Sequence, residues 1–310
     1  MPIVKHRKIF FVFSAILITA SVFAWIFLEP TFGIDFTGGS ILEVSYSDNR
    51  PELSLLHESL DELNLGNYSL RPSGESGYVL RTREVDANEK TQILNAFSLG
   101  SEREVNEERF NLIGPVVGES LKRKSIWAIA TVLLGIVLFV TFAFRKVSLS
   151  IGRQGDKGLS SWKYGLATIA ALVHDVVIPT GAYVVFGKYF SAEIDLLFVT
   201  AILAVLGYSV HDTIVVFDRI REHLRINQER NLREPFEKTV GDSLMQTMGR
   251  SVNTSLTLLL VLIILYFVGG SATQSFTFLL LAGVIVGTYS SIFFGAPLLV
   301  TLEKFQARNK

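Results

Sequence analysis

The chain has 310 residues, of which 49% are hydrophobic and only 19% are charged, and its mean hydropathy is +0.39. This composition excludes an ordinary soluble protein and predicts a polytopic membrane protein with one modest soluble insertion. The formal net charge is zero, so nucleic acid is not an expected partner, and the absence of cysteine excludes a disulfide framework and a thiolate metal site.

A first apolar run covers residues 9–28 and follows a basic N-terminus. It is long enough to cross the ~30 Å hydrocarbon core of a bilayer. A secretory signal peptide would have a shorter apolar region and a cleavage site of small residues, and this sequence has neither. We therefore expect residues 1–28 to form an N-terminal segment and a retained first span.

Residues 29–124 are polar and mixed, and they form the one predicted soluble domain. Alternating apolar and polar residues predict strands at 41–46, 68–70, 78–83 and 102–112. Apolar residues at helical spacing predict helices at 51–65 and 87–97. The order β-α-β-β-α-β predicts a small α+β domain of the ferredoxin-like type. A binding or docking role is expected for it, because no cluster of His, Cys or carboxylates has metal-ligand spacing.

Two segments that flank this domain are candidate hinges. Residues 33–40 are rich in glycine, but they lack the lysine of a phosphate loop, so a conformationally permissive start of the domain is expected instead of a nucleotide site. The segment 114–118 is expected to break the structure before the second span. The hinge candidates are Gly38, Gly39, Gly114 and Pro115.

Five further spans are expected in a membrane domain that covers residues 125–310. They are predicted at 126–144, 164–186, 194–217, 252–268 and 276–299. Basic residues cluster at the N-terminus, between alternate spans and in the C-terminal tail. The positive-inside rule makes these segments cytoplasmic, and six spans satisfy it. Lys122, Arg123 and Lys124 contradict the rule locally, because they adjoin a span on its outer side.

Asp212 is the principal candidate for function, because it lies roughly one and a half turns inside the polar end of an apolar span. An ionisable group at such a position costs about 2.5 to 3.5 kcal/mol and normally faces the interior of a bundle. His211 precedes it, and His174 and Asp175 repeat the same order in the third span. Arg250 is a candidate counter-charge. A proton relay through these residues and a static pair that only stabilises the bundle both remain open.

Small residues recur every four positions in the last span, which predicts a ridge that another helix can approach closely. Its members are Gly283, Gly287, Ser291 and Gly295. This ridge, the helix that carries Asp212, and Asn253 are candidates for contact with a partner protein. Apolar residues between 236 and 248 also recur every four positions, which predicts an amphipathic helix, either solvated or on the inner membrane surface.

Four blocks in this order resemble the SecF family of protein-export membrane proteins, in the resistance-nodulation-division superfamily: 33–39, 210–222, 253–255 and 287–291. The resemblance covers nearly the whole chain. It implies an accessory subunit of the bacterial Sec translocase in the inner membrane, with cytoplasmic termini and a periplasmic α+β domain. The expected partners are SecD, the SecYEG translocon, unfolded preproteins and the lipid bilayer.

The resemblance also implies a source of energy, because SecD and SecF together are thought to use the proton motive force to promote export on the periplasmic side. Asp212 matches a family position implicated in proton transport, and Arg250 matches the basic position that opens the fifth span. The sequence departs from many relatives at Ser275, where they carry an acidic residue just before the final span.

Two other classes of function remain open. One is a purely structural scaffold of the translocon without ion transport, and the other is half of a small-molecule exporter that would need a second six-span half. An enzyme is not expected, because no nucleophile, base and oxyanion set converges in the sequence. No cofactor or metal is expected, and the coupling ion could be a proton or a sodium ion.

Overall fold

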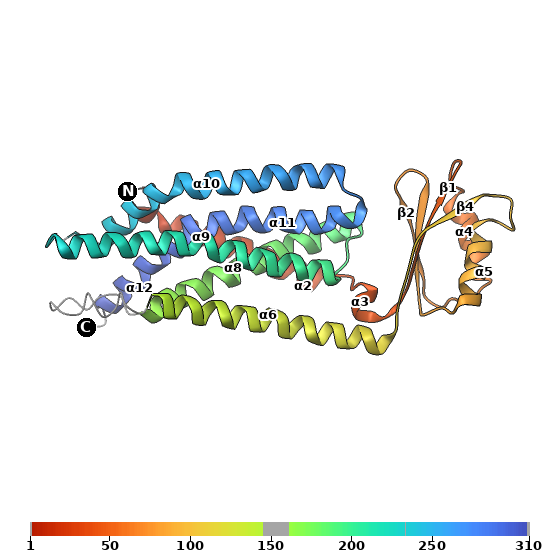
Figure 1. The fold of residues 1–310 in the computed structure, drawn as a ribbon, viewed down its shortest axis with the longest axis horizontal. Coiled ribbons are helices and arrows are strands. Elements are labelled where there is room, and N and C mark those ends of the chain that lie inside the picture. The colour runs from red at the N-terminus through yellow and green to blue at the C-terminus, as the bar shows by residue number, and fades with distance from the viewer. Residues whose placement is uncertain (1, 145–160, 233, 309–310) are drawn as a thin grey trace. The chain divides into compact units, whose positions relative to one another are not determined.

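The computed structural model describes residues 2–144, 161–232 and 234–308 (Figure 1). The chain divides into two compact units. The helical unit comprises Met1–Pro30, Ala128–Ala192 and Leu197–Lys310, and the α+β unit comprises Thr31–Trp127 together with Glu193–Leu196. The α+β unit overlaps the segment 29–124 and also includes one short segment that precedes α9.

The described residues contain six helices that are long and apolar enough to span a membrane, as the sequence predicts. The first five are α2 (Arg7–Phe27), α6 (Pro115–Ala143), α8 (Ser161–Phe190), α9 (Leu196–Glu229) and α10 (Phe236–Val268). The sixth is continuous through α11 (Ser271–Ser290), one wide π-helical turn η2 (Ser291–Gly295) and α12 (Ala296–Arg308). A short helix, α1 (Pro2–Lys5), precedes α2. Most of the basic segment that the sequence places between the second and third spans lies at 145–160, outside the described residues.

The apolar stripe at 236–248 is not a separate surface helix, so that prediction is wrong. It forms the first part of α10, which has 33 residues and, at ~1.5 Å per residue, exceeds the ~30 Å hydrocarbon thickness. Val240 and Leu244 are buried against Val4 of α1 and Leu299 of α12. Tertiary packing within the chain therefore covers the apolar face that we expected at a lipid surface.

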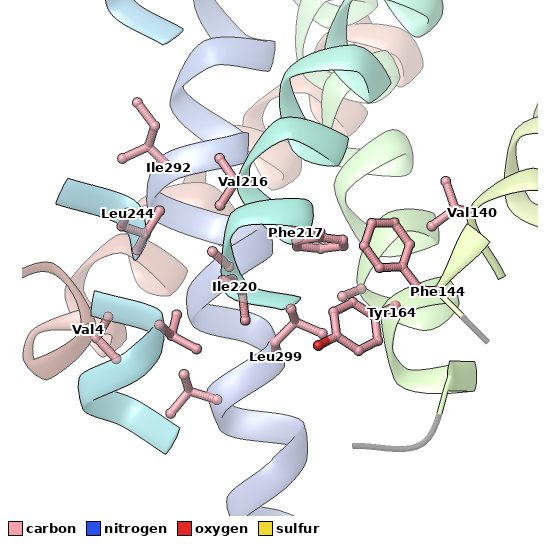
Figure 2. Packing of buried hydrophobic residues seen from close by; sticks show 14 residues of the cluster. Val4, Val140, Phe144, Tyr164, Val216, Phe217, Ile220, Leu244, Ile292 and Leu299 are labelled. Atoms are coloured by element: carbon pink, nitrogen blue, oxygen red, sulfur yellow. The ribbon is translucent and has the colours of Figure 1, made fainter. Parts of the chain in front are cut away.

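Aromatic side chains from three helices hold one end of the helical unit together (Figure 2). The Phe144 and Tyr164 rings stack with centroids 5.1 Å apart, and Phe217 of α9 meets them edge-on at 6.0 and 5.5 Å. Such aromatic pairs are each worth about 0.5 to 1.5 kcal/mol beyond the area they bury. The cluster fixes α8, α9 and the residue that follows α6 against one another.

The α+β unit has the predicted β-α-β-β-α-β order. Its strands are β1 (Gly39–Tyr46), β2 (Ser69–Ser73), β3 (Gly77–Thr82) and β4 (Val105–Ile113), in one antiparallel sheet of order β2-β3-β1-β4. Its helices are α3 (Ile34–Thr37), α4 (Leu53–Asp61) and α5 (Ala87–Phe97). Figure 1 shows α4 and α5 on one side of the sheet. This topology confirms the ferredoxin-like prediction.

The core of this unit follows from the sequence periodicity. Leu42, Val44 and Tyr46 of β1 alternate with less buried residues and pack against Leu60 of α4 and Phe97 of α5. The predicted helix 51–65 ends earlier, at Asp61, and the predicted strand 102–112 begins later, at Val105. Turns formed by residues with positive φ set these two limits. Asn64 and Gly66 follow α4, and Leu99, Gly100 and Ser101 precede β4.

Candidate functional site

Asp175 lies at the centre of a polar network inside the helical unit. Its side chain and that of His174 are fully buried, and His174 Nδ1 lies 2.8 Å from Asp175 Oδ1. The other carboxylate oxygen accepts hydrogen bonds from Ser209 of α9 and, at 2.7 Å, from Ser290 of α11. Three helices therefore converge on one buried carboxyl group, as membrane-embedded carboxyls require.

The second nitrogen of His174 extends the network to α2. His174 Nε2 lies 3.1 Å from the Ser14 hydroxyl, which lies 3.3 Å from the Tyr289 hydroxyl. Tyr289 also donates to the backbone carbonyl of Phe10 at 3.1 Å. The imidazole stacks on the ring of Phe294, with centroids 4.9 Å apart, which restricts its rotation.

Asp212 occupies a second polar site on α9 and is only 7% exposed. Ser251 of α10 donates to Asp212 Oδ1 at 2.5 Å. The other oxygen, Oδ2, is buried without a hydrogen bond of ordinary geometry from the described residues, although the Ser291 hydroxyl is its neighbour. Ser291 itself shares a hydrogen bond of 2.9 Å with Thr213.

The two carboxyl sites are joined through their neighbours. Ser290 bonds Asp175, while the adjacent Ser291 lies beside Asp212. On α9, Ser209 bonds Asp175 and precedes Asp212 by three residues, so both face the same side of the helix. The structure therefore brings Asp175 and Asp212 into one polar region between α8, α9, α10 and α11.

Two predicted members of the relay lie outside this region. Arg250 is exposed and, within the part of the chain that the structure describes, forms no ion pair with Asp212. Successive helical residues point about 100° apart, so α10 can direct either Arg250 or Ser251 at α9, and Ser251 takes that position. On α9 the adjacent His211 and Asp212 also point in different directions, so Asp212 is buried and His211 is exposed. The predicted counter-charge is therefore replaced here by a hydroxyl.

The small-residue ridge is buried inside the chain, so its predicted role as a surface for a partner is wrong. A Cβ at Gly283 would lie 2.2 Å from Val205 Cγ2, and one at Gly287 would lie 3.1 Å from Ser209 Cβ. Gly295 lies against Ala171 of α8. The ridge lets the last span approach α9 and α8 of the same chain, which places Ser290 and Ser291 at the site. Asn253 is exposed, and its contact with a partner stays a prediction.

Irregular helix geometry accompanies the site. The turn η2 begins at Ser291, and Pro297 follows it in α12. Proline lacks an N–H group, so the helix cannot keep its regular hydrogen bonds there, and π-helical turns often occur at functional sites. In α8, Pro179 follows Asp175 by four residues and leaves the Asp175 carbonyl without its usual helical donor.

The glycine-rich segment 33–39 is tightly packed in the α+β unit. Gly38 and Gly39 have φ values of +73° and +125°, and a Cβ at Gly39 would lie 2.6 Å from the Thr82 carbonyl. A Cβ at Gly38 would lie 2.8 Å from Pro115 Cα. Both the backbone conformation and the close approach exclude a side chain. Whether these glycines also act as hinges stays a prediction.

The expected break at 114–118 is confined to Gly114, which separates β4 from α6. Pro115 is the first residue of α6, the position at which its missing N–H group has no cost. Only Gly114 stays outside the helix, and Gly118 lies within it, where a Cβ would come 2.9 Å from the Gly38 nitrogen. Residues 115–118 therefore form the first turn of α6, within the part of that helix that belongs to the α+β unit.

Sequence reasoning missed a set of bonds that ties residues 193–196 to the glycine-rich segment. Gly33 and Ile194 are joined through the 2.9 Å bond from the Gly33 N–H to the Ile194 carbonyl, and Ile194 donates to Thr31 at 2.9 Å. Asp35 Oδ2 accepts from the Leu196 N–H at 2.9 Å and thus caps the first residue of α9. Burial raises the pKa of the nearby Glu193, and its ion pair with Arg81 opposes that shift.

Comparison with known proteins identifies the family. The family model for the protein export membrane protein SecD/SecF, C-terminal, matches residues 94–152 and 160–305, and that for the SecD/SecF GG motif matches residues 23–49. The protein translocase subunit SecF of Thermobaculum terrenum is 38% identical over 98% of this chain and 94% of its own length. The chain belongs to the SecF family. SecF of Sebaldella termitidis is 34% identical over the whole chain and 94% of its own length.

Solved structures agree with this assignment. The crystal structure of SecDF from Thermus thermophilus, described as a translocon-associated membrane protein, superposes with a TM-score of 0.81 at 27% identity over 98% of this chain. SecDF in its super-membrane-facing form gives a TM-score of 0.67 at 26% identity over the whole chain. This chain spans only 39% and 40% of those two proteins. The fold is therefore that of part of SecDF.

Proposed function

We propose that this protein acts as an accessory subunit of the bacterial Sec translocase and, with SecD, uses the proton motive force to promote preprotein export. In this proposal it lies in the inner membrane beside SecYEG, with both termini cytoplasmic and the α+β unit periplasmic. The names of its SecF relatives and the translocon association of SecDF support the subunit role. The polar site supports the use of an ion gradient.

The proposal depends mainly on the hydroxyl groups that bond the two buried carboxyl groups. Ser251 donates to Asp212, and Ser209 and Ser290 donate to Asp175 Oδ2. No described arginine or lysine takes part in these hydrogen bonds. A guanidinium partner would favour only the charged carboxylate. A hydroxyl can donate to a carboxylate and can also accept from a carboxylic acid, so it accommodates both protonation states. Carboxyl groups in such surroundings suit a proton that must arrive and leave.

The helix arrangement suggests how proton movement is converted into motion. One elementary charge that crosses 100 mV releases about 2.3 kcal/mol, which is enough to change the populations of two arrangements by more than tenfold. Changing the charge of Asp212 or Asp175 alters the hydrogen bonds that α9 makes with α8, α10 and α11.

The experiment uses inverted membrane vesicles that contain SecYEG, SecD and this chain. Preprotein translocation is measured with and without an ionophore for wild type, Asp212→Asn and Asp218→Asn. Asp218 is an exposed residue on the same helix and provides a matched control for the substitution. We expect Asp212→Asn to abolish the ionophore-sensitive part of translocation while the complex with SecD remains intact, and Asp218→Asn to behave as wild type.

Equal ionophore-sensitive translocation in wild type and Asp212→Asn would contradict the proposal. The scaffold function would then account better for the chain, because a purely structural Asp212 only needs a polar side chain of the same size. The amount of SecD recovered with each variant separates a failure of assembly from a failure of the gradient-driven step.

A further inference from the structure

Four contacts around His174 form a single chain of hydrogen bonds. His174 Nδ1 meets Asp175 Oδ1 at 2.8 Å, and His174 Nε2 meets Ser14 Oγ at 3.1 Å. Ser14 Oγ meets Tyr289 Oη at 3.3 Å, and Tyr289 Oη meets the Phe10 carbonyl at 3.1 Å. Each hydroxyl has one proton to donate, so the direction of every bond can be assigned from the end where there is no choice.

The Phe10 carbonyl oxygen can only accept a hydrogen bond. Tyr289 must therefore donate to Phe10, and it accepts from Ser14. The single Ser14 proton is then used, so Ser14 accepts from His174. It follows that His174 Nε2 carries a proton when all of these bonds are made.

A second proton lies between the imidazole and the carboxyl group, because the 2.8 Å contact of Nδ1 with Asp175 Oδ1 needs a donor. The pair then consists either of an imidazolium and a carboxylate, or of an Nε2–H imidazole and a carboxylic acid. The two forms contain the same number of protons and differ only in the position of the shared one. The hydroxyls of Ser209 and Ser290 occupy the other carboxyl oxygen in both forms.

Loss of one proton from the pair changes the bonds between α2 and α11. The imidazole becomes the Nδ1–H tautomer, its Nε2 becomes an acceptor, and Ser14 must donate to it. Tyr289 can then donate to Ser14 or to Phe10, but not to both, so one bond between α2 and α11 is lost. The proton content of the His174–Asp175 pair is thereby coupled to the contact between these two helices.

We propose that Ser14 and Tyr289 are positioning residues that hold the His174–Asp175 pair in its proton-bearing form and couple release of that proton to the contact between α2 and α11. Neither residue touches the carboxyl groups, and each acts through His174. The biological meaning rests on the proposed function, since it assigns a step of proton transfer to α2. The chemical claim, that His174 Nε2 carries a proton, stands independently.

The test is nitrogen-15 NMR of the full chain, labelled at histidine, in lipid bilayers with SecD. The sequence has five histidines, and loss of one signal in His174→Gln assigns the residue. We expect a protonated Nε2 in the wild type. In Tyr289→Phe and Ser14→Ala the population should shift toward unprotonated Nε2 by roughly fivefold, the usual worth of one hydrogen bond. Ser14→Thr, which keeps the hydroxyl, should resemble the wild type.

Tyr266→Phe supplies the matched control, because Tyr266 lies on α10 and its hydroxyl has no hydrogen-bond partner among the described residues. An unprotonated Nε2 in the wild type would overturn the proposal without any variant. An unchanged His174 signal in both Tyr289→Phe and Ser14→Ala would also overturn it. Gradient-driven translocation of the same variants, in vesicles that also contain SecYEG, separates the two proposals. A wild type that does not respond to the gradient contradicts the proposed function, while the NMR result still decides the proton assignment.

Discussion

The Asp212 carboxylate and the Ser251 hydroxyl form a 2.5 Å hydrogen bond that joins α9 to α10 inside the helical unit. Asp212 Oδ2 has no comparable partner among the described residues, so the bond from Ser251 is the main polar contact that holds this carboxyl group. A buried carboxyl group that loses its donor is strongly disfavoured in its charged form. The Ser251 hydroxyl is therefore expected to stabilise the charged form of Asp212.

Ser251→Ala tests this dependence. A hydrogen bond to a charged group contributes about 1.5 to 3 kcal/mol, so we expect gradient-driven translocation to fall by about tenfold or more. Ser251→Thr keeps the hydroxyl group and should retain most of the activity. The measurement is the ionophore-sensitive rate in vesicles with matched amounts of the complex. Similar rates for the alanine and threonine variants would mean that the hydroxyl group is not needed.

Gly283→Ala tests the close packing of the last span on α9. The added Cβ would lie 2.2 Å from Val205 Cγ2, and such overpacking costs typically 1–3 kcal/mol. We expect a lower thermal unfolding midpoint in detergent, and Val205→Ala should restore part of the loss. Gly207→Ala is the control, because a Cβ there meets no atom of the other described residues within 4 Å beyond the backbone of its own helix. Equal midpoints for the two Gly→Ala variants would contradict the packing described here.

Asp35→Ala tests the cap that the glycine-rich segment supplies to α9. Loss of a side-chain cap costs about 1 kcal/mol, so the amide of Leu196, which donates to Asp35, should exchange with solvent roughly fivefold faster. Asp35→Asn keeps an acceptor oxygen and should exchange more slowly than Asp35→Ala. Hydrogen exchange of the full chain provides the measurement, with the amides of α5 as an internal reference. Unchanged exchange at Leu196 in Asp35→Ala would show that the cap is dispensable.

Glu89 gives the α+β unit a pH dependence. Its hydrogen bond from Arg83 holds the pKa of the Glu89 carboxyl below the ordinary value of 4.5. The folded state therefore favours the charged form, and this stabilisation is fully present above pH 4.5 and is lost as the pH falls through the folded value. Amide protection of α5 should be weaker in Glu89→Gln than in wild type at pH 7, and the difference should vanish in acid. Glu75→Gln, in an exposed turn, should match the wild type throughout.

The sequence predicts the spans and the topology of the α+β unit because both depend on patterns that are local in the chain. Hydropathy over about 20 residues identifies a membrane helix. Period-two alternation in β1 identifies a strand with one buried face. The extent of α10 cannot be predicted in this way. The sequence shows that its first part is helical and apolar on one face, but only the packing of that face with Val4 and Leu299 shows what covers it.

The site is predicted less completely than the fold. Asp212, His174 and Asp175 are conspicuous, because ionisable residues are rare in apolar spans. The serines that bond them, Ser209 and Ser251, are common residues in membrane helices and carry no such signal alone. Only the rotation of each helix decides which polar residue faces inward, and this rotation is set by close contacts such as that of Gly283 with Val205.

Proton transport through Asp175 and Asp212 is the central claim, and proton flux tests it most directly. Proteoliposomes that contain SecD and this chain would enclose a pH-sensitive dye, and a proton gradient or, separately, a sodium gradient would be imposed. We expect internal acidification above that of empty liposomes with the proton gradient, reduced to background in Asp212→Asn and in Asp175→Asn but not in Asp218→Asn. Flux that is equal in wild type and in both buried variants would contradict the account.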